Sequence, residues 1–421
     1  MANDTEKKGR FGRTIKRGIE DTFYIWKEEF RNVFRDTGVI IFFFLVPLAY
    51  PLIYSFIYNN EVARDAELVV VDQSGTTYSR EFARKVDATP DVKVVAYCTD
   101  MSDAKQMLDE KKAYGILFIP ESFSKDLHTG KQTTVSLYSD MSALLYYKNF
   151  LIAATEVSLD MGKEVVQHLN PSKTREEAKI AVNPIPYESI AMFNPQNGFG
   201  SFLVPAILIL VIQQTLILGI CMLSGTAREK NNLHTLVPAN LHYHGTLRIV
   251  FGKSLTYIVL YVIVCCWTLV VVPALFNFPQ LARPGTITLF VLPYLFACIF
   301  FSMTVSGFVI SRESPMLIFV FTSVILLFIS GISWPAHAIH GVWKAVSYIF
   351  PSTPAIQGFV AINSMGATLE DVALEYNILW LQAGVYFILA CIVYRHQIIR
   401  IQRKMQGEST SLLASKEKNS F

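Results

Sequence analysis

The residues of this sequence that could do chemistry are few and widely spaced. His242 and His244 stand two positions apart in a polar stretch, with His234 and His340 elsewhere. A zinc site needs three or four ligands in a compact arrangement, whereas paired histidines in a polar loop are more often surface residues. We therefore expect no metal site and no other cofactor.

Motifs for catalysis are missing from the sequence. It has no Gly-rich phosphate loop ending in Lys-Ser/Thr, no HExxH, no CxxC and no nucleophile elbow. Without a loop that cradles phosphates, the chain should not hydrolyse ATP itself. We expect that it is not an enzyme and that energy for any work comes from another molecule.

Two groups of polar residues adjoin apolar segments. Gln213 and Gln214 lie inside one, where unpaired amides are costly, so they should face other helices or a cavity. Hydrogen bonding between helices is the favoured interpretation, and contact with a substrate is the alternative. Arg228, Glu229 and Lys230 form the second group and come shortly after the C-terminal end of the same segment.

Apolar segments long enough to cross a bilayer position these groups. Hydrophobic residues make up 52% of the 421 residues and charged residues 17%, and a span takes about 20 mainly apolar residues. No segment carries a charge in its middle. We predict six transmembrane helices, at Gly38–Tyr58, Phe202–Leu223, Ser254–Phe276, Thr286–Ile310, Met316–Trp334 and Ile378–Tyr394.

The distribution of Lys and Arg near the span ends predicts the orientation. These residues concentrate before the first span, after the second, after the fourth and after the sixth, whereas the alternate short loops hold only Arg283 and Lys344. Both termini should therefore be cytoplasmic, with the large domain outside. The net charge of +3 is spread over these flanks, which gives no support for nucleic-acid binding.

The predicted organisation has five parts. The first span has no small-residue cleavage site after it and should be an uncleaved anchor. The parts are a cytoplasmic N-terminus (1–37), the first span (38–58), an extracytoplasmic α/β domain (59–198), a five-helix region (199–395) and a cytoplasmic tail (396–421). The five-helix region includes a cytoplasmic loop (224–253) and an outer apolar element (335–358) that is too short to span and should be re-entrant.

The N-terminal part has two predicted sections. Residues 1–17 are polar and basic, which predicts disorder. Apolar residues then recur at helical spacing from Ile19 through Phe23, Trp26 and Phe30 to Val33. Such an amphipathic helix beside a span should lie in the membrane interface. Packing on protein is the alternative, and both can hold together.

The part after the first span alternates strands and helices. Strands are expected at Glu67–Asp72, Val92–Tyr97, Tyr114–Pro120 and Thr133–Ser139, and helices between them and from about Ser142 to Leu169. Such alternation is typical of an α/β domain with a largely parallel sheet. Only one of the six cysteines, Cys98, lies in this part. The domain must therefore fold on its own core, without an internal disulfide.

Ordered landmarks along the chain resemble one transporter family. They are Val69–Ser74 with Ser79-Arg80-Glu81, Tyr114–Pro120, Phe123–Leu127 with Gly130, Asn194-Pro195, Arg228-Glu229, Leu236, Pro238, Gly252-Lys253, Ser330-Gly331, Trp334-Pro335 and Pro351. In this order they resemble the permease subunit of ABC-2 type exporters with a large outer domain after the first span. The resemblance covers nearly the whole chain.

The resemblance implies function, partners and site residues. It implies a bacterial inner-membrane permease that exports an amphipathic or hydrophobic substrate as a dimer, either with a second copy or with a paralogue. Separate ATPase subunits drive such a dimer, often with a periplasmic adaptor. The residues implied to couple the ATPase are Arg228, Glu229, Lys230, His234 and Lys253, and candidates for the substrate path are Gln213, Gln214, Ser330 and Trp334.

One departure from the family pattern concerns the coupling region. Family members usually have Gly-Thr and acidic residues soon after Arg-Glu, whereas Asn231-Asn232-Leu233-His234 stands here. Contacts with the ATPase should differ accordingly.

Two other functions remain open: a membrane-anchored receptor with an outer ligand domain, and an ion-driven transporter. Against a receptor, this sequence has no cytoplasmic segment after residue 37 long enough for an output domain. Against an ion-driven transporter, its predicted spans have no charged residue in their middle, whereas such transporters usually carry ionisable residues there.

Overall fold

The chain folds into two compact units in the computed structural model. One unit comprises Met1–Glu61 and Met192–Phe421, and the other comprises Val62–Ala191. The structure describes residues 2–172, 174–186, 188, 190–195, 197–231 and 245–418.

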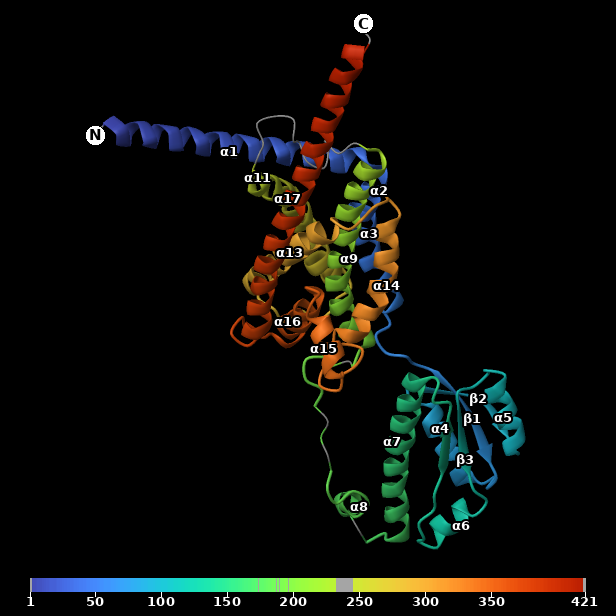
Figure 1. The fold of residues 1–421 in the computed structure, drawn as a ribbon. Coiled ribbons are helices and arrows are strands. Elements are labelled where there is room, and N and C mark those ends of the chain that lie inside the picture. Colours follow the sequence, from blue (N-terminus) through green and yellow to red (C-terminus); the bar gives the residue numbers. More distant parts are fainter. Residues whose placement is uncertain are drawn as a thin grey trace. The chain divides into compact units, whose positions relative to one another are not determined.

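The first unit is a bundle of helices (Figure 1). Two of its segments, η1 and η2, are π-helical turns inside longer helices. Its elements are α1 (Ala2–Arg35), α2 (Thr37–Ile40), η1 (Ile41–Leu45), α3 (Val46–Ile57), α9 (Phe199–Glu229), α11 (Thr246–Cys266), η2 (Trp267–Val271), α12 (Val272–Leu275), α13 (Pro284–Val305), α14 (Ser314–Ile329), α15 (Gly341–Ser347), α16 (Ser352–Met365) and α17 (Ala373–Lys418).

Within the described residues, five helices are long and apolar enough to cross a membrane. They are Thr37–Ile57, Phe199–Glu229, Thr246–Leu275, Pro284–Val305 and Ala373–Ile401. The protein is therefore a multi-pass, mainly helical membrane protein. α9 is the central helix, with 89% of its most apolar stretch buried, and it packs against α3, α13, α14 and α16.

The fifth predicted span differs from the structure. Met316–Trp334 was expected to cross, but α14 ends at Ile329 after 16 residues, which extend about 24 Å. The helix stops because Gly331 adopts a left-handed backbone conformation, with φ of +90°. Thus α14 is shorter than the roughly 30 Å hydrocarbon core of a bilayer.

A bent pair of helices follows α14. α15 and α16 meet at an angle of 87°, and together they are apolar enough for one broken span or a re-entrant loop. The predicted re-entrant element at 335–358 covers α15 and the first half of α16. Counting the pair as one span would give six in the part of the chain that the structure describes.

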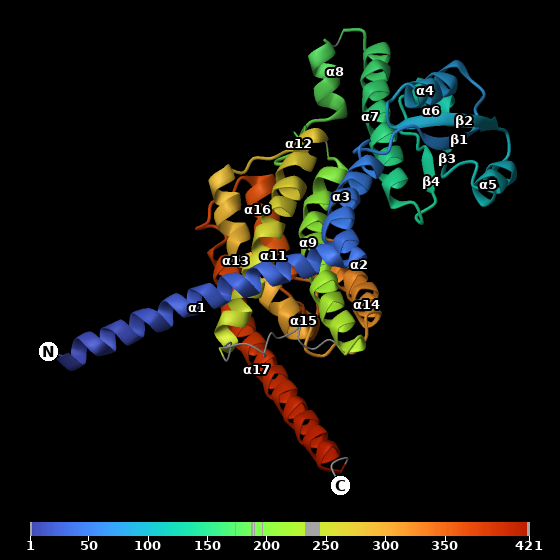
Figure 2. The same cartoon turned by 90° about the horizontal axis from the view of Figure 1, so that it is seen from above.

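Helix α1 lies across one end of the bundle, at the end where α17 leaves it (Figures 1 and 2). It begins at Ala2, so the disorder predicted for residues 1–17 is not observed. Ile25 and Val33 are buried, and α1 packs on α11. Ile19 and Phe23 remain exposed. The helix therefore packs on protein along one face and keeps a second apolar face uncovered.

The second unit is an α/β fold. Its elements are β1 (Ala66–Asp72), α4 (Thr77–Asp87), β2 (Val92–Cys98), α5 (Met101–Asp109), β3 (Gly115–Ile119), α6 (Phe123–His128), β4 (Ser136–Ser139), α7 (Leu144–Leu169) and α8 (Arg175–Val182). The strand order is β2-β1-β3-β4. β1 pairs in parallel with β2 and β3, and β4 pairs antiparallel with β3, so the sheet is largely parallel, as the alternation predicts.

Both faces of the sheet are covered, which explains the continuous apolar run in β1. Leu68 and Val70 pack with Phe82 of α4 and Phe150 of α7. Val69 and the other residues of the opposite face pack against α5. A central strand buried on both faces needs apolar residues at successive positions, and Val69-Val70-Val71 supplies them.

Candidate functional site

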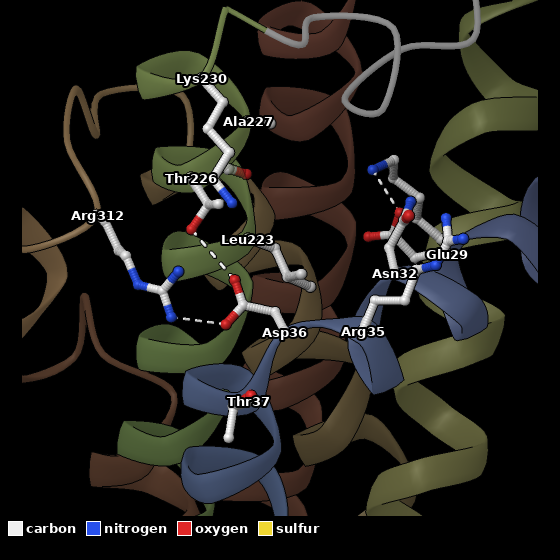
Figure 3. A pocket seen from close by; sticks show the side chains of 12 residues that line it. Glu29, Asn32, Arg35, Asp36, Thr37, Leu223, Thr226, Ala227, Lys230 and Arg312 are labelled. Carbon is white, nitrogen blue, oxygen red and sulfur yellow. Dashed lines mark hydrogen bonds and ion pairs between the residues drawn. The ribbon is translucent and has the colours of Figure 1, made fainter.

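A polar cavity of about 440 Å³ lies at the end of the bundle that α1 crosses (Figure 3). Its walls come from the end of α1, the start of α2, the last turns of α9, α11 and the turn between α13 and α14. The polar side chains around it are Glu29, Asn32, Arg35, Asp36, Thr37, Ser224, Thr226, Lys230, Lys253 and Arg312. Segments far apart in the sequence therefore meet at one place.

Asp36 joins three of these segments. It has an extended backbone and caps α2, accepting a hydrogen bond from the Gly38 N–H at 3.0 Å, as expected of a helix N-cap. The same carboxylate pairs with the Arg312 guanidinium at 2.7 Å, and Thr226 donates to its other oxygen at 3.3 Å. Figure 3 shows both contacts converging on Asp36. One carboxylate thus ties α2 to α9 and to the α13–α14 turn.

The predicted coupling pair, Arg228 and Glu229, faces the segment after α13. The Arg228 guanidinium donates to the carbonyl of Ser306 at 2.8 Å and to that of Val309. Cations commonly satisfy the free carbonyls at a helix C-terminus in this way. The Glu229 carboxylate accepts from the Arg312 backbone N–H at 3.2 Å. Both side chains therefore fix the end of α9 to segment 306–312.

Lys253 lies inside α11 instead of in a loop. That helix begins at Thr246, earlier than the predicted start at Ser254. The Lys253 ammonium pairs with the Glu29 carboxylate at 2.7 Å, and both side chains are only 4% exposed. Tyr257 donates to the second oxygen of Glu29, and the ammonium lies 5.9 Å from the centre of the Tyr394 ring.

Further contacts fasten α1 to α11. Arg248 pairs with Asp21 at 2.6 Å, and the Thr256 hydroxyl donates to the Trp26 carbonyl at 3.1 Å. Gly252 permits the close approach, because a Cβ there would lie 2.9 Å from the Thr22 carbonyl oxygen. These contacts join α1, the predicted amphipathic interfacial helix, to the span that contains α11.

The remaining coupling candidates differ in position. Lys230 borders the cavity and forms no ion pair with any residue that the structure describes. His234 lies outside the described residues, together with the rest of 232–244, including His242 and His244. Among the residues that are described, no three His, Cys, Asp or Glu side chains come together as metal ligands.

The substrate-path candidates lie away from this cavity. The side-chain Oε1 of Gln213 accepts from the Ser352 N–H at the start of α16, at 2.6 Å. Gln214 donates to Thr322 of α14 at 3.3 Å. Both amides are buried and link helices, which favours hydrogen bonding between helices over contact with a substrate. Ser330 is buried at the end of α14, whereas Trp334 is exposed.

Among the residues of the site that were not identified from the sequence, Glu29, Asp36 and Arg312 form its ion pairs. A signal existed for Glu29, which stands four positions from both Ile25 and Val33 and hence on the buried face of α1. A signal also existed for Asp36, because an Asp before Thr-Gly is a typical helix start. Nothing in the sequence singles out Arg312 as the partner of Asp36.

Comparison with known proteins adds a family relationship. Residues 37–392 match the profile of a family described as ABC-2 family transporter protein. A 91-residue stretch is 31% identical to the linearmycin resistance permease protein LnrN of Bacillus subtilis (strain 168), covering 21% of this chain. The match spans 23% of that relative's length.

Proposed function

Because this chain belongs to the family of ABC-2 transporter proteins, we propose that it is the permease subunit of an ATP-driven exporter. Two copies, or one copy and a paralogue, form the transmembrane part, and a separate ATPase supplies the energy. We propose that the cargo is amphipathic or hydrophobic. In this proposal the membrane is the bacterial inner membrane, and a periplasmic adaptor is an optional partner.

The proposed orientation places the α1 end of the bundle in the cytoplasm and the Val62–Ala191 unit outside. Its support is the excess of Lys and Arg in the segments that adjoin this end. The stretch 232–244, which connects α9 to α11, then faces the ATPase. Ser330 and Trp334 stay substrate-path candidates at the opposite end, while Gln213 and Gln214 serve helix packing.

The observation that carries the proposal is the way α9 and α11 are anchored on either side of that stretch. Arg228 and Glu229 bind the end of α9 to segment 306–312, and Lys253 binds the start of α11 to α1. A pull on the stretch between them would move these elements together. ATP-bound and ATP-free states of the partner must hold the stretch differently, since only differential binding shifts a conformational equilibrium.

The test is reconstitution of the purified chain with its ATPase partner in proteoliposomes. The chain alone should show no ATP hydrolysis, and the pair should hydrolyse ATP and move cargo. Arg228→Ala with Glu229→Ala should leave hydrolysis and assembly intact but abolish export. Hydrolysis by the homogeneous chain alone, or cargo movement driven by an ion gradient without ATP, would contradict the proposal. Normal export by the double variant would show that force enters elsewhere, for example through α1.

A further inference from the structure

The charges around the cavity do not balance. Arg312 is paired with Asp36 and Lys253 with Glu29. Two further cations, Arg35 and Lys230, border the cavity, and neither forms an ion pair with any residue that the structure describes. The lining therefore carries two uncompensated positive charges, and a ligand that fits it should be an anion.

The position of the cavity suggests where the anion comes from. Thr37 is the first residue of one span, and Lys230 directly follows another. The cavity therefore lies at the level where spans leave the hydrocarbon, which is the level of lipid headgroups. Ile19 and Phe23 leave α1 with an exposed apolar face, as in helices that lie in a membrane interface.

An apolar surface begins beside Arg35, one of these two cations. Phe34, next to Arg35, is exposed and its ring lies 5.6 Å from that of Phe44 in η1. Ile41 and Leu45, in the same turn as Phe44, are also exposed. A molecule with an anionic head at Arg35 and acyl chains along η1 would meet matching chemistry at both ends.

We propose that this cavity binds the phosphate of an anionic glycerophospholipid from the adjoining leaflet, such as phosphatidylglycerol. Arg35, beside Glu29 and Asn32, and Lys230, above Thr226, border the cavity from two sides with exposed side chains (Figure 3). Together they supply the positive charge that attracts the phosphate, because guanidinium and ammonium groups are the usual protein partners of phosphate oxygens. The acyl chains lie along Phe34 and η1. The site goes beyond the proposed export function, and its occupation depends neither on ATP nor on the orientation of the chain.

The experiment measures lipid binding to the detergent-purified full-length chain by native mass spectrometry. Phosphatidylglycerol should bind more tightly than phosphatidylcholine. Each basic residue near an anionic lipid surface contributes about fivefold in affinity, so Arg35→Ala with Lys230→Ala should weaken phosphatidylglycerol binding by roughly thirtyfold and leave phosphatidylcholine unchanged. Arg35→Lys with Lys230→Arg should retain the affinity for phosphatidylglycerol, because the site recognises the charge of the lipid and not the shape of the two side chains.

A matched control removes the same charge from α1 outside the cavity, by Lys27→Ala with Arg31→Ala. Loss of binding in this control equal to that in the cavity variant would overturn the proposal. Unchanged phosphatidylglycerol binding in the cavity variant would also overturn it, as would displacement of the lipid by equimolar glycerol 3-phosphate, which would identify a free phosphate as the ligand. If the cavity variant keeps lipid affinity but no longer copurifies with the ATPase, the cavity is a protein-docking site. Circular dichroism and size-exclusion chromatography confirm that each variant is folded.

Discussion

The ion pair between Glu29 and Lys253 should hold α1 on the bundle, and it gives the sharpest prediction. The two charged groups are 2.7 Å apart and almost fully buried. Removing one partner leaves the other charge buried without compensation, which costs about 3–5 kcal/mol. Lys253→Met should produce this loss, because Tyr257 is then the one donor left to the Glu29 carboxylate among the residues that the structure describes. Glu29→Gln should fall at the lower end, since the ammonium still lies beside the Tyr394 ring.

The double variant distinguishes the interaction between Glu29 and Lys253 from the effect of each residue alone. Replacing both residues removes both buried charges, and an apolar replacement of a buried pair is often neutral or stabilising. Glu29→Gln with Lys253→Met should therefore cost less than either single change. Such non-additivity is what a double-mutant cycle detects for residues in contact.

Hydrogen–deuterium exchange of α1 measures the effect locally. A loss of about 3 kcal/mol corresponds to a fall of more than a hundredfold in protection. Glu28→Gln is the matched control. Glu28 is partly exposed, and its carboxylate lies 4.0 Å from the Arg31 guanidinium, a geometry worth under about 1 kcal/mol. If both single variants of the pair lose no more protection than this control, or if the double variant loses the sum, the reasoning is refuted.

Three other predictions concern topology, pH and the buried amides. In a cysteine-free background, a cysteine at Lys131 should react with an impermeant reagent from outside and one at Asn231 should not; labelling of Asn231 in intact cells would contradict the orientation. The hydrogen bond from Lys111 at 2.6 Å lowers the pKa of Asp140 to about 2, so its stabilising effect should be complete above about pH 4 and disappear as the pH falls toward 2. Lys111→Ala should return this pKa toward 3.8, as a carboxyl NMR titration would show, and an unshifted titration would disprove the assignment. Gln214→Leu should cost under about 2 kcal/mol and preserve export, and loss of export by a stably folded variant would place Gln214 in the substrate path.

Local patterns made much of this fold predictable. The strands around Val69 and Ile116 are apolar runs bounded by turn residues, and that information lies within a few positions of the sequence. The same holds for the apolar length of α9. Boundaries were less predictable: Thr246 begins α11 because tertiary contacts with α1 stabilise polar turns that composition alone assigns to a loop.

The candidate site was predictable only in part. Arg228 and Glu229 were identified by resemblance to a family, and their contacts with segment 306–312 require the fold. The pairing of Asp36 with Arg312 joins residues 276 positions apart. No sequence periodicity predicts such a pairing, because it depends on how the helices pack. Asp36 before α2 and Arg312 between α13 and α14 meet beside the end of α9.

The short helix α14 has a consequence for the lipid around it. Its roughly 24 Å leaves about 6 Å of a 30 Å hydrocarbon layer unmatched, and its exposed Leu317, Phe321 and Phe328 give lipid an apolar surface over that reduced height. Lipids next to a short span adapt by local thinning of the bilayer. A bilayer crossed by α14 would therefore be thinner beside this helix than beside a longer one such as α9.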